Sequence, residues 1–163
     1  MKLTPLCELE FQYTWTDFVD LGAGGQYIGI LDGVATGDRL KGTLKLVNVP
    51  PKRPDNVNCP TIRGILTTDD GGKIYLEMNG IALLRQEDKA RVFTTSLSLR
   101  SGDARYAWVN TVFGVVEGVL NTTTDMARAR AFACANDIEV VWKEAETGNE
   151  EPPGQSRRSA VRF

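Results

Sequence analysis

The sequence predicts an all-β protein folded as a single antiparallel β-barrel, and three observations support this. Short alternating or apolar runs recur along the 163 residues, Gly, Asp and Asn punctuate them, and no long helix is evident. About seven to nine short strands fit either a closed barrel or a sandwich. We favour the barrel because closure leaves no exposed strand edge. A barrel of about eight strands can also hold one small ligand.

The first strands come from the N-terminal part of the chain. Residues 9–15 alternate between large apolar or aromatic and polar side chains, which predicts a strand with one aromatic face formed by Leu9, Phe11, Tyr13 and Trp15. Further strands are expected at 27–31 and 40–49, joined by a turn at Asp32-Gly33. Glycines near these strands, Gly37 and Gly42, predict bulges or sharp bends of the kind that barrel corners require.

A proline-rich loop at 50–60 precedes the clearest hairpin of the sequence. Proline cannot donate a hydrogen bond to a strand ladder, so we expect this segment to be a loop. Alternating runs at 61–68 and 73–79 flank Asp69-Asp70-Gly71-Gly72, and Asp-Gly between two such runs predicts a hairpin turn. Asp69 and Asp70 are therefore interpreted as turn residues rather than as metal ligands or acid–base groups.

The remaining expected strands lie at 91–99, 107–120, 126–134 and 138–142, the second with a bulge at Gly114, and 81–89 is expected to hold one helical turn. Alanines at every second position of 127–133 suit a crowded inner face, which places Arg128 and Arg130 on the outer face. We expect residues 1–143 to form the barrel domain. Residues 144–163 are polar and contain Gly and Pro, which predicts a flexible C-terminal tail.

Composition excludes several functions. A net charge of −2 and scattered basic residues argue against a nucleic-acid partner. There is no histidine, which excludes Ser-His-Asp and Cys-His nucleophile systems and removes the commonest metal ligand. The three cysteines, Cys7, Cys59 and Cys134, lack the CxxC spacing of zinc sites. We therefore expect no metal and no cofactor, and proton chemistry limited to carboxylates, Tyr, Lys or Cys.

The sequence also predicts a cytoplasmic protein. Its start has no long apolar segment of the kind that a secretory signal contains, and no apolar run reaches the ~20 residues of a membrane helix. An odd number of cysteines in a chain that needs no disulfide favours a reducing compartment.

Two glutamates are the candidate catalytic acids. Glu77 shares one face of its strand with Tyr75, and this face either contacts water or lines a polar lumen. Glu117 is the only acid of a long apolar strand, where it is either exposed by alternation or buried, and the neighbouring Gly114 and Gly118 would leave space beside it. Burial would raise the pKa of either carboxyl, which would then be a neutral proton donor.

Three further residues are candidate substrate-binding groups. Trp108 is either a core residue or an aromatic face against a ligand, and Asn110 is unusual inside a strand, where it would need hydrogen bonds. Arg105 either forms an ion pair with Asp103 or holds an anionic or phenolic oxygen at the mouth of the barrel.

Several blocks together resemble a bacterial and fungal family of small proteins catalogued as domain of unknown function 3237. They are a TxDGxxIY hairpin that runs from Thr68 to Tyr75 and ends at Gly80, and a GDxRYAWLN block from Gly102 to Asn110 in which Val109 replaces Leu. The resemblance implies a β-barrel of lipocalin-like or allene-oxide-cyclase-like form that is often a homo-oligomer. Some fungal members resemble cofactor-free cyclases that close an oxygen ring by adding a phenol across a prenyl alkene.

Two functions remain open on this basis. In the first, a cyclase or isomerase, Glu117 or Glu77 protonates an alkene, Trp108 or Tyr75 stabilises the cation, and Arg105 or Asn110 orients the phenol. In the second, the barrel binds or carries an apolar small molecule without changing it. Glutamates exposed on the outside of the barrel would favour the second.

Overall fold

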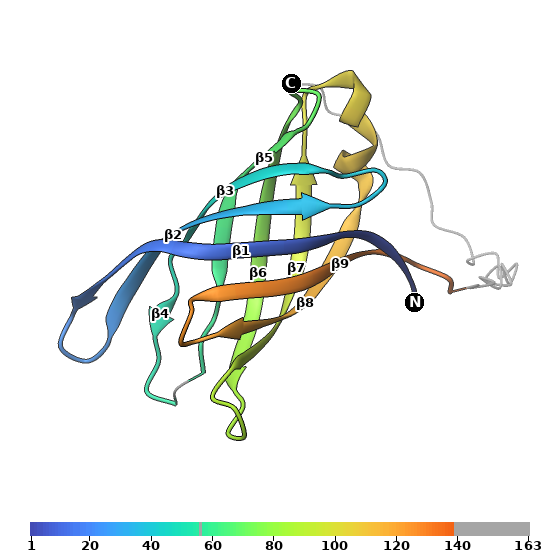
Figure 1. The fold of residues 1–163 in the computed structure, drawn as a ribbon. Helices are drawn as coiled ribbons and strands as arrows, with labels where there is room; N and C mark the ends of the chain where they lie inside the picture. The colour runs from blue at the N-terminus through green and yellow to red at the C-terminus, as the bar shows by residue number, and fades with distance from the viewer. Residues whose placement is uncertain (56, 139–163) are drawn as a thin grey trace, which may run out of the picture.

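The computed structural model describes residues 1–55 and 57–138, which form a closed antiparallel β-barrel of eight long strands with one short additional strand and one 3₁₀ helix (Figure 1). The elements in chain order are β1 (Lys2–Asp20), β2 (Gly25–Thr36), β3 (Gly42–Asn48), β4 (Pro51–Lys52), β5 (Thr61–Thr68), β6 (Lys73–Leu84), β7 (Arg91–Arg100), η1 (Ala104–Thr111), β8 (Phe113–Asn121) and β9 (Met126–Ala135). The predicted fold class is therefore confirmed.

The barrel closes because β1 pairs with two strands. Glu8 lies opposite Arg130 of β9 on one side and opposite Thr36 of β2 on the other. The remaining neighbours follow the order β9, β8, β7, β6, β5, β3, β2, so all eight long strands are paired on both sides. No helix in the described part of the chain is long and apolar enough to cross a membrane.

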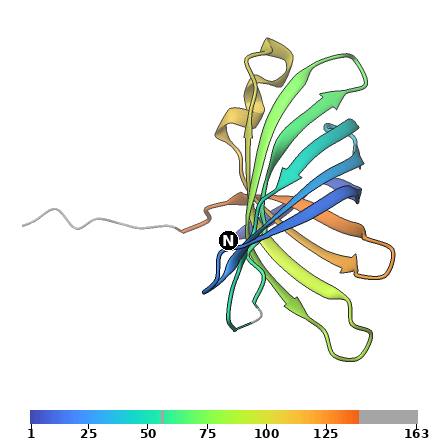
Figure 2. The same ribbon diagram turned by 90° about the vertical axis from the view of Figure 1, so that its left-hand side faces the viewer.

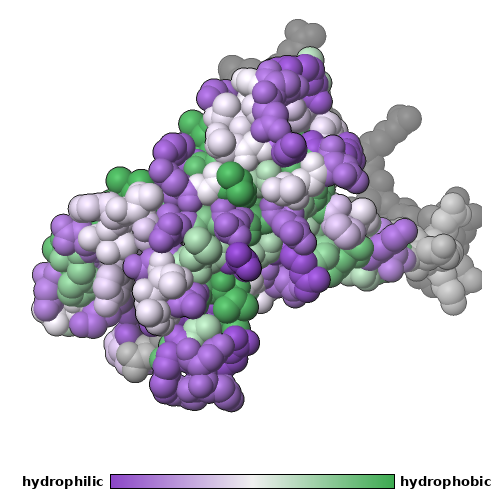
Figure 3. Space-filling view, viewed as in Figure 1, coloured by the Kyte–Doolittle hydropathy of each residue, from purple (hydrophilic) through white to green (hydrophobic). Residues whose placement is uncertain are grey.

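Side chains alternate between a packed interior and the outer wall. Leu31, Ile74 and Val116 are fully buried at the centre of the barrel. The prediction for 127–133 is confirmed, since Ala127, Ala129 and Ala131 are buried while Arg128 and Arg130 are exposed. The outer wall mixes hydrophobic and hydrophilic residues, and the turn between β6 and β7 at the bottom of the view is hydrophilic (Figure 3).

The single long strand predicted over 107–120 is wrong. Residues 104–111 form η1 instead, and β8 begins only at Phe113. Asp103 caps η1 by accepting a hydrogen bond from the backbone N–H of Arg105 at 3.0 Å. Val109 is fully buried and closes this end of the barrel, so the alternation of RYAWVN was misleading.

Two other local predictions are wrong. The helical turn expected at 81–89 is absent, because β6 continues to Leu84 and buries Ala82 inside the barrel. Asp32-Gly33 is not a turn but the middle of β2, where a Cβ on Gly33 would lie 2.4 Å from the backbone oxygen of Glu10. Ile138 lies outside any strand, and the rest of the strand expected at 138–142 and the tail expected at 144–163 fall outside the described residues.

Candidate functional site

At one end of the barrel, hydrogen bonds and ion pairs join the β5–β6 turn to η1. Asp70, in the β5–β6 turn, accepts hydrogen bonds from the Thr68 hydroxyl at 2.6 Å and the Tyr106 hydroxyl at 2.7 Å. Arg105 of η1 pairs with Asp70 at 2.8 Å and with Asp103 at 2.6 Å. The Thr68 and Tyr106 hydroxyls lower the pKa of Asp70 to about 2. Asp70 is therefore a turn residue, as predicted, and Arg105 is engaged in ion pairs.

Trp108 and Asn110 lie at the same closed end. The Arg39 guanidinium stacks 3.7 Å from the centre of the Trp108 ring. Asn110 is exposed and exchanges two hydrogen bonds with the backbone of Ser101, at 2.8 and 2.9 Å, which fix the end of η1. The three predicted substrate-binding residues are thus brought together, in contacts that hold η1 against the barrel.

Glu77 and Tyr75 lie on the outer wall of β6. Glu77 pairs with Arg63 and Arg100, each at 3.3 Å, and accepts a hydrogen bond from the Tyr75 hydroxyl at 2.8 Å. The Tyr75 hydroxyl and the two guanidiniums lower the pKa of Glu77. Of the two alternatives for Glu77, the structure favours the outer face, and the lowered pKa argues against the neutral carboxyl of the polar-lumen alternative.

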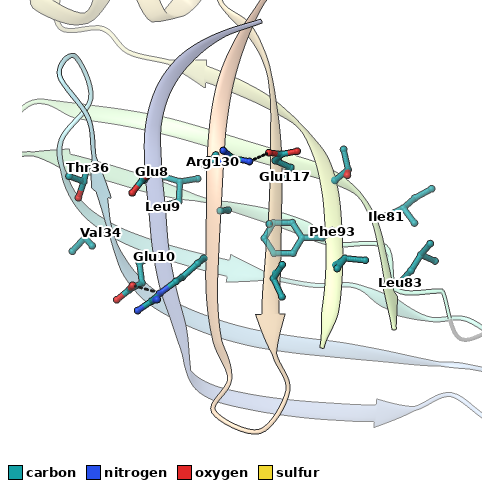
Figure 4. A pocket seen from close by; sticks show the side chains of 16 residues that line it. Glu8, Leu9, Glu10, Val34, Thr36, Ile81, Leu83, Phe93, Glu117 and Arg130 are labelled. Atoms are coloured by element: carbon teal, nitrogen blue, oxygen red, sulfur yellow. Dashed lines mark hydrogen bonds and ion pairs between the residues drawn. The ribbon is translucent and has the colours of Figure 1, made fainter. Parts of the chain in front are cut away.

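Glu117 also lies on the outer wall, where it pairs with Arg130 of β9 at 2.6 Å and its side chain is 53% exposed (Figure 4). The space that Gly118 opens is on the other side of the sheet and is filled by Phe93, because a Cβ on Gly118 would lie 2.3 Å from Phe93 Cζ. Of the two alternatives for Glu117, exposed by alternation or buried, the structure shows the exposed one, while the catalytic roles of both glutamates remain predictions that only an activity measurement tests.

An open groove of about 890 Å³ lies on this outer wall, and we call it the outer groove (Figure 4). Exposed apolar side chains, including Ile81, Leu83 and Val119, line one part of it. Charged side chains line another part, and two ion pairs join them: Glu117–Arg130, and Glu10–Arg128 at 2.9 Å. These charges neutralise one another at the surface.

The β6–β7 hairpin lies at the end of the barrel opposite η1 (Figures 1 and 2). A second cavity, which we call the mouth cavity, enters the barrel near this hairpin, between residues that include Ala82 and Arg91. This mouth cavity has a volume of about 100 Å³, which is below the ~300–1,000 Å³ of typical ligand pockets and suits one ring or the end of a larger molecule. Its wall is largely apolar with a few polar groups, and consists of Phe11, Tyr13, Asn48, Asn58, Pro60, Ile62, Ala82, Arg91, Phe93, Leu120 and Ala127.

Tyr13 and Asn48 form a fixed polar pair in the mouth cavity. The backbone N–H of Thr61 donates to Asn48 Oδ1 at 2.9 Å, which orients the amide so that its Nδ2 donates to the Tyr13 hydroxyl oxygen at 2.7 Å. Asn48 uses the oxygen of Tyr13 as an acceptor, and the hydroxyl hydrogen has no acceptor among the described residues, so it can donate to a ligand. Burial raises the pKa of Tyr13, which keeps the phenol neutral.

Arg91, at the start of β7, contributes the positive charge of the mouth cavity. Its Nη1 atom is buried and has no hydrogen-bond partner among the described residues. It interacts electrostatically with Tyr13, whose pKa it acts to lower. A buried guanidinium N–H without a partner costs free energy, which binding of an acceptor would recover.

The rings around the mouth cavity occupy space that glycines leave open. A Cβ on Gly29 would lie 2.5 Å from Tyr13 Cε1, and Gly118 makes room for Phe93 as described above. The register of β1 against β2 shifts between Tyr13 and Trp15, and a bulge of this kind changes the direction of neighbouring side chains. Tyr13 consequently contacts the core whereas Trp15 is exposed.

Sequence reasoning placed Tyr13 on the aromatic face of its strand but missed the site to which it belongs. Asn48 and Arg91 were not singled out at all. A buried Asn at the end of an apolar strand, followed by a proline-rich loop, was the one available signal, because such an amide requires hydrogen-bond partners.

No protein-family model matches the sequence, and no curated protein matches it. Solved structures do. A β-barrel-like protein from Acinetobacter baumannii is similar with a TM-score of 0.73 at 19% identity, over 81% of this chain and 94% of that one. A protein of unknown function from Clostridium acetobutylicum gives a TM-score of 0.72 at 18% identity, over 83% of this chain and 100% of that one.

An enzyme from the fungus Penicillium herquei is also similar, with a TM-score of 0.61 at 14% identity over 80% of this chain and 93% of that one. At these identities the likeness shows a shared barrel fold. The chain therefore has the fold of small β-barrel proteins that include one fungal enzyme.

Proposed function

We propose that this barrel binds a small aromatic or otherwise unsaturated molecule in the mouth cavity. The observation that carries the proposal is the fixed Tyr13–Asn48 pair, which presents a free hydroxyl hydrogen to a largely apolar cavity. A concave apolar wall with a few oriented polar groups is typical of small-molecule sites. The ion-paired positions of Glu77 and Glu117 on the outer wall also favour binding at the mouth over chemistry at these carboxyls.

A cofactor-free cyclase or isomerase is the second candidate, favoured by the free hydroxyl hydrogen of Tyr13 and by the fold shared with a fungal enzyme. In intramolecular hydroalkoxylation, the phenol oxygen of the substrate forms a C–O bond to one alkene carbon and the other carbon takes a proton. Tyr13 would supply that proton and recover one from the substrate phenol, so substrate and product are isomers. A neutral phenol such as Tyr13 is a weak acid, so positioning of the substrate would have to contribute much of the rate enhancement.

Both candidates are tested by incubating the purified protein, without cofactor, with prenylated polycyclic phenols in deuterated buffer. Chiral chromatography and mass spectrometry follow the products. Unchanged phenol that stays with the protein supports binding, and an optically active product with one deuterium at the former alkene supports cyclisation. If none of the phenols is retained or converted, the proposal for this ligand class fails.

A cavity-filling variant shows where the ligand sits. Ala127 is buried in the wall of the mouth cavity, so Ala127→Leu should abolish retention and turnover, and Ala82→Leu should do the same from the opposite wall. Ala107→Leu makes the same change at an exposed position of η1 and should have no effect. Full retention in both cavity variants would contradict the mouth cavity as the site.

A second copy of this chain is the partner that we propose for the outer groove. The groove combines exposed apolar residues with charged residues of both signs, and such a surface can form the self-complementary contact of a two-fold dimer. Light scattering coupled to size-exclusion chromatography should give a dimer or larger oligomer, and Val119→Asp should yield a monomer. A monomeric wild-type protein at high concentration would contradict this proposal.

A further inference from the structure

Arg91 lies where the interior of the barrel meets solvent. It is the first residue of β7 and pairs with Leu84 of β6 and Leu120 of β8, so aliphatic side chains surround its backbone. Phe93 and Thr95 follow on the inner face of the same strand and are buried. The guanidinium therefore belongs to the wall of the cavity, and its buried Nη1 has no acceptor among the residues that the structure describes.

No carboxylate in the described part of the chain lies within ion-pair distance of Arg91. Two acids in the loops at this end already have basic partners, since Asp88 pairs with Arg85 at 2.5 Å and Asp55 pairs with Arg53. Asp125 also lies at this end: its backbone oxygen accepts from the Tyr13 N–H at 3.1 Å, and its carboxylate acts to raise the pKa of Tyr13. Arg91 forms no ion pair with this carboxylate, and its buried Nη1 has no acceptor among the described residues.

We infer that the mouth cavity is built for an anionic ligand, a planar carboxylate or phenolate on a single unsaturated ring, whose oxygen accepts from Arg91 Nη1 while Tyr13 donates a second hydrogen bond. This inference rests on the proposed binding function and adds the charge of the ligand. A hydrogen bond from a cation to an anionic oxygen is about twice as strong as a neutral one, and strongest where water is excluded. The ~100 Å³ of the cavity limits the buried part to about one ring.

The charge preference is measured by isothermal titration calorimetry with benzoate and benzyl alcohol, two probes of the same size that differ in charge, at neutral pH. Wild type should bind benzoate at least about tenfold more tightly. Arg91→Gln should weaken benzoate binding much more than benzyl alcohol binding, so that the difference between the two probes disappears. Arg91→Lys, which keeps the charge, should retain part of it. Arg128→Gln removes an exposed arginine of the outer wall and should behave like wild type.

The outcomes separate the two proposals. Equal affinity for the two probes in wild type, or an unchanged benzoate preference in Arg91→Gln, would overturn the inference while the binding function stands. Absence of binding of either probe to a folded wild-type protein would count against both. Thermal unfolding of each variant controls for folding, and Arg91→Gln should not be destabilised, because it removes a half-buried guanidinium whose buried Nη1 has no partner among the described residues.

Discussion

Removing one oxygen atom from Tyr13 tests the polar pair on which the candidate site depends. Tyr13→Phe keeps the ring and its packing but leaves Asn48 Nδ2 without the acceptor that now lies 2.7 Å away. Asn48 is only 3% exposed, so water cannot easily replace the lost partner. A buried donor left unsatisfied costs about 1–3 kcal/mol of unfolding free energy.

The assay is urea and thermal unfolding monitored by circular dichroism. For a chain of this size, the expected loss corresponds to a decrease in Tm of roughly 2–12 °C, at about 2–4 °C per kcal/mol. Tyr27→Phe is the matched control, because Tyr27 is 40% exposed at the tip of the β1–β2 hairpin and its ring stacks on Phe18, a contact that the substitution keeps. The control should change the stability by less than about 0.5 kcal/mol.

A double-mutant cycle separates the bond from other effects of each substitution. Tyr13→Phe combined with Asn48→Ala should cost less than the sum of the single variants, because the orphaned donor is then absent as well. The energetic coupling of Asn48 and Tyr13 would be refuted in two ways: if Tyr13→Phe were as stable as Tyr27→Phe, or if the effects in the cycle were additive.

Three further predictions follow from other parts of the barrel. Gly118→Ala should destabilise the fold by about 1–3 kcal/mol and weaken benzoate binding, because the new Cβ would overlap Phe93. Gly102→Ala is the control: a Cβ there would have nothing within 4 Å, so it should be neutral in the same denaturation and titration assays. Burial raises the pKa of Cys7 from 9.0 to about 11, so the thiol's contribution to stability is complete below pH 9 and is lost as the pH rises to 11, by up to about 3 kcal/mol. Cys7→Ala should flatten this alkaline slope, and an unchanged slope would contradict the assignment. Asp70→Asn should loosen the closed end, because it loses the ion pair with Arg105, and hydrogen exchange at the η1 backbone should accelerate. The pKa of Asp70 is lowered from 3.8 to about 2, so wild type should lose the stabilisation that the ionised Asp70 carboxylate provides as the pH falls through that interval. Equal exchange rates in wild type and Asp70→Asn would argue against a role of Asp70 in holding η1.

The fold could be predicted where local sequence determines it. The hairpin of β5 and β6 is specified by an Asp-Gly turn between alternating runs, and the bounds expected for β5 match the structure. The alanines of β9 were small enough to identify the inner face of that strand. The strand prediction failed at 104–111 because an alternating pattern is also compatible with a short 3₁₀ helix. Here Asp103 caps that helix and Val109 is buried in the core.

The site was harder to predict because it depends on which face of each strand is inside. Both faces of β8 are largely apolar, so alternation alone could not place Glu117, and the pairing with Arg130 of β9 was needed to do so. The Tyr13–Asn48 pair joins residues 35 positions apart, and its orientation depends on a register shift in β1. Neither relation is visible without strand pairing.

The most direct test of the central claim is a crystal structure of the protein with 4-bromobenzoate, in which the anomalous signal of bromine locates the ligand independently of the protein density. Our account predicts a single bromine site at the mouth of the barrel, with the carboxylate beside Arg91 Nη1 and the Tyr13 hydroxyl. A ligand located in the outer groove beside Glu117, with an empty mouth cavity, would contradict the account and return the outer-wall glutamates to consideration.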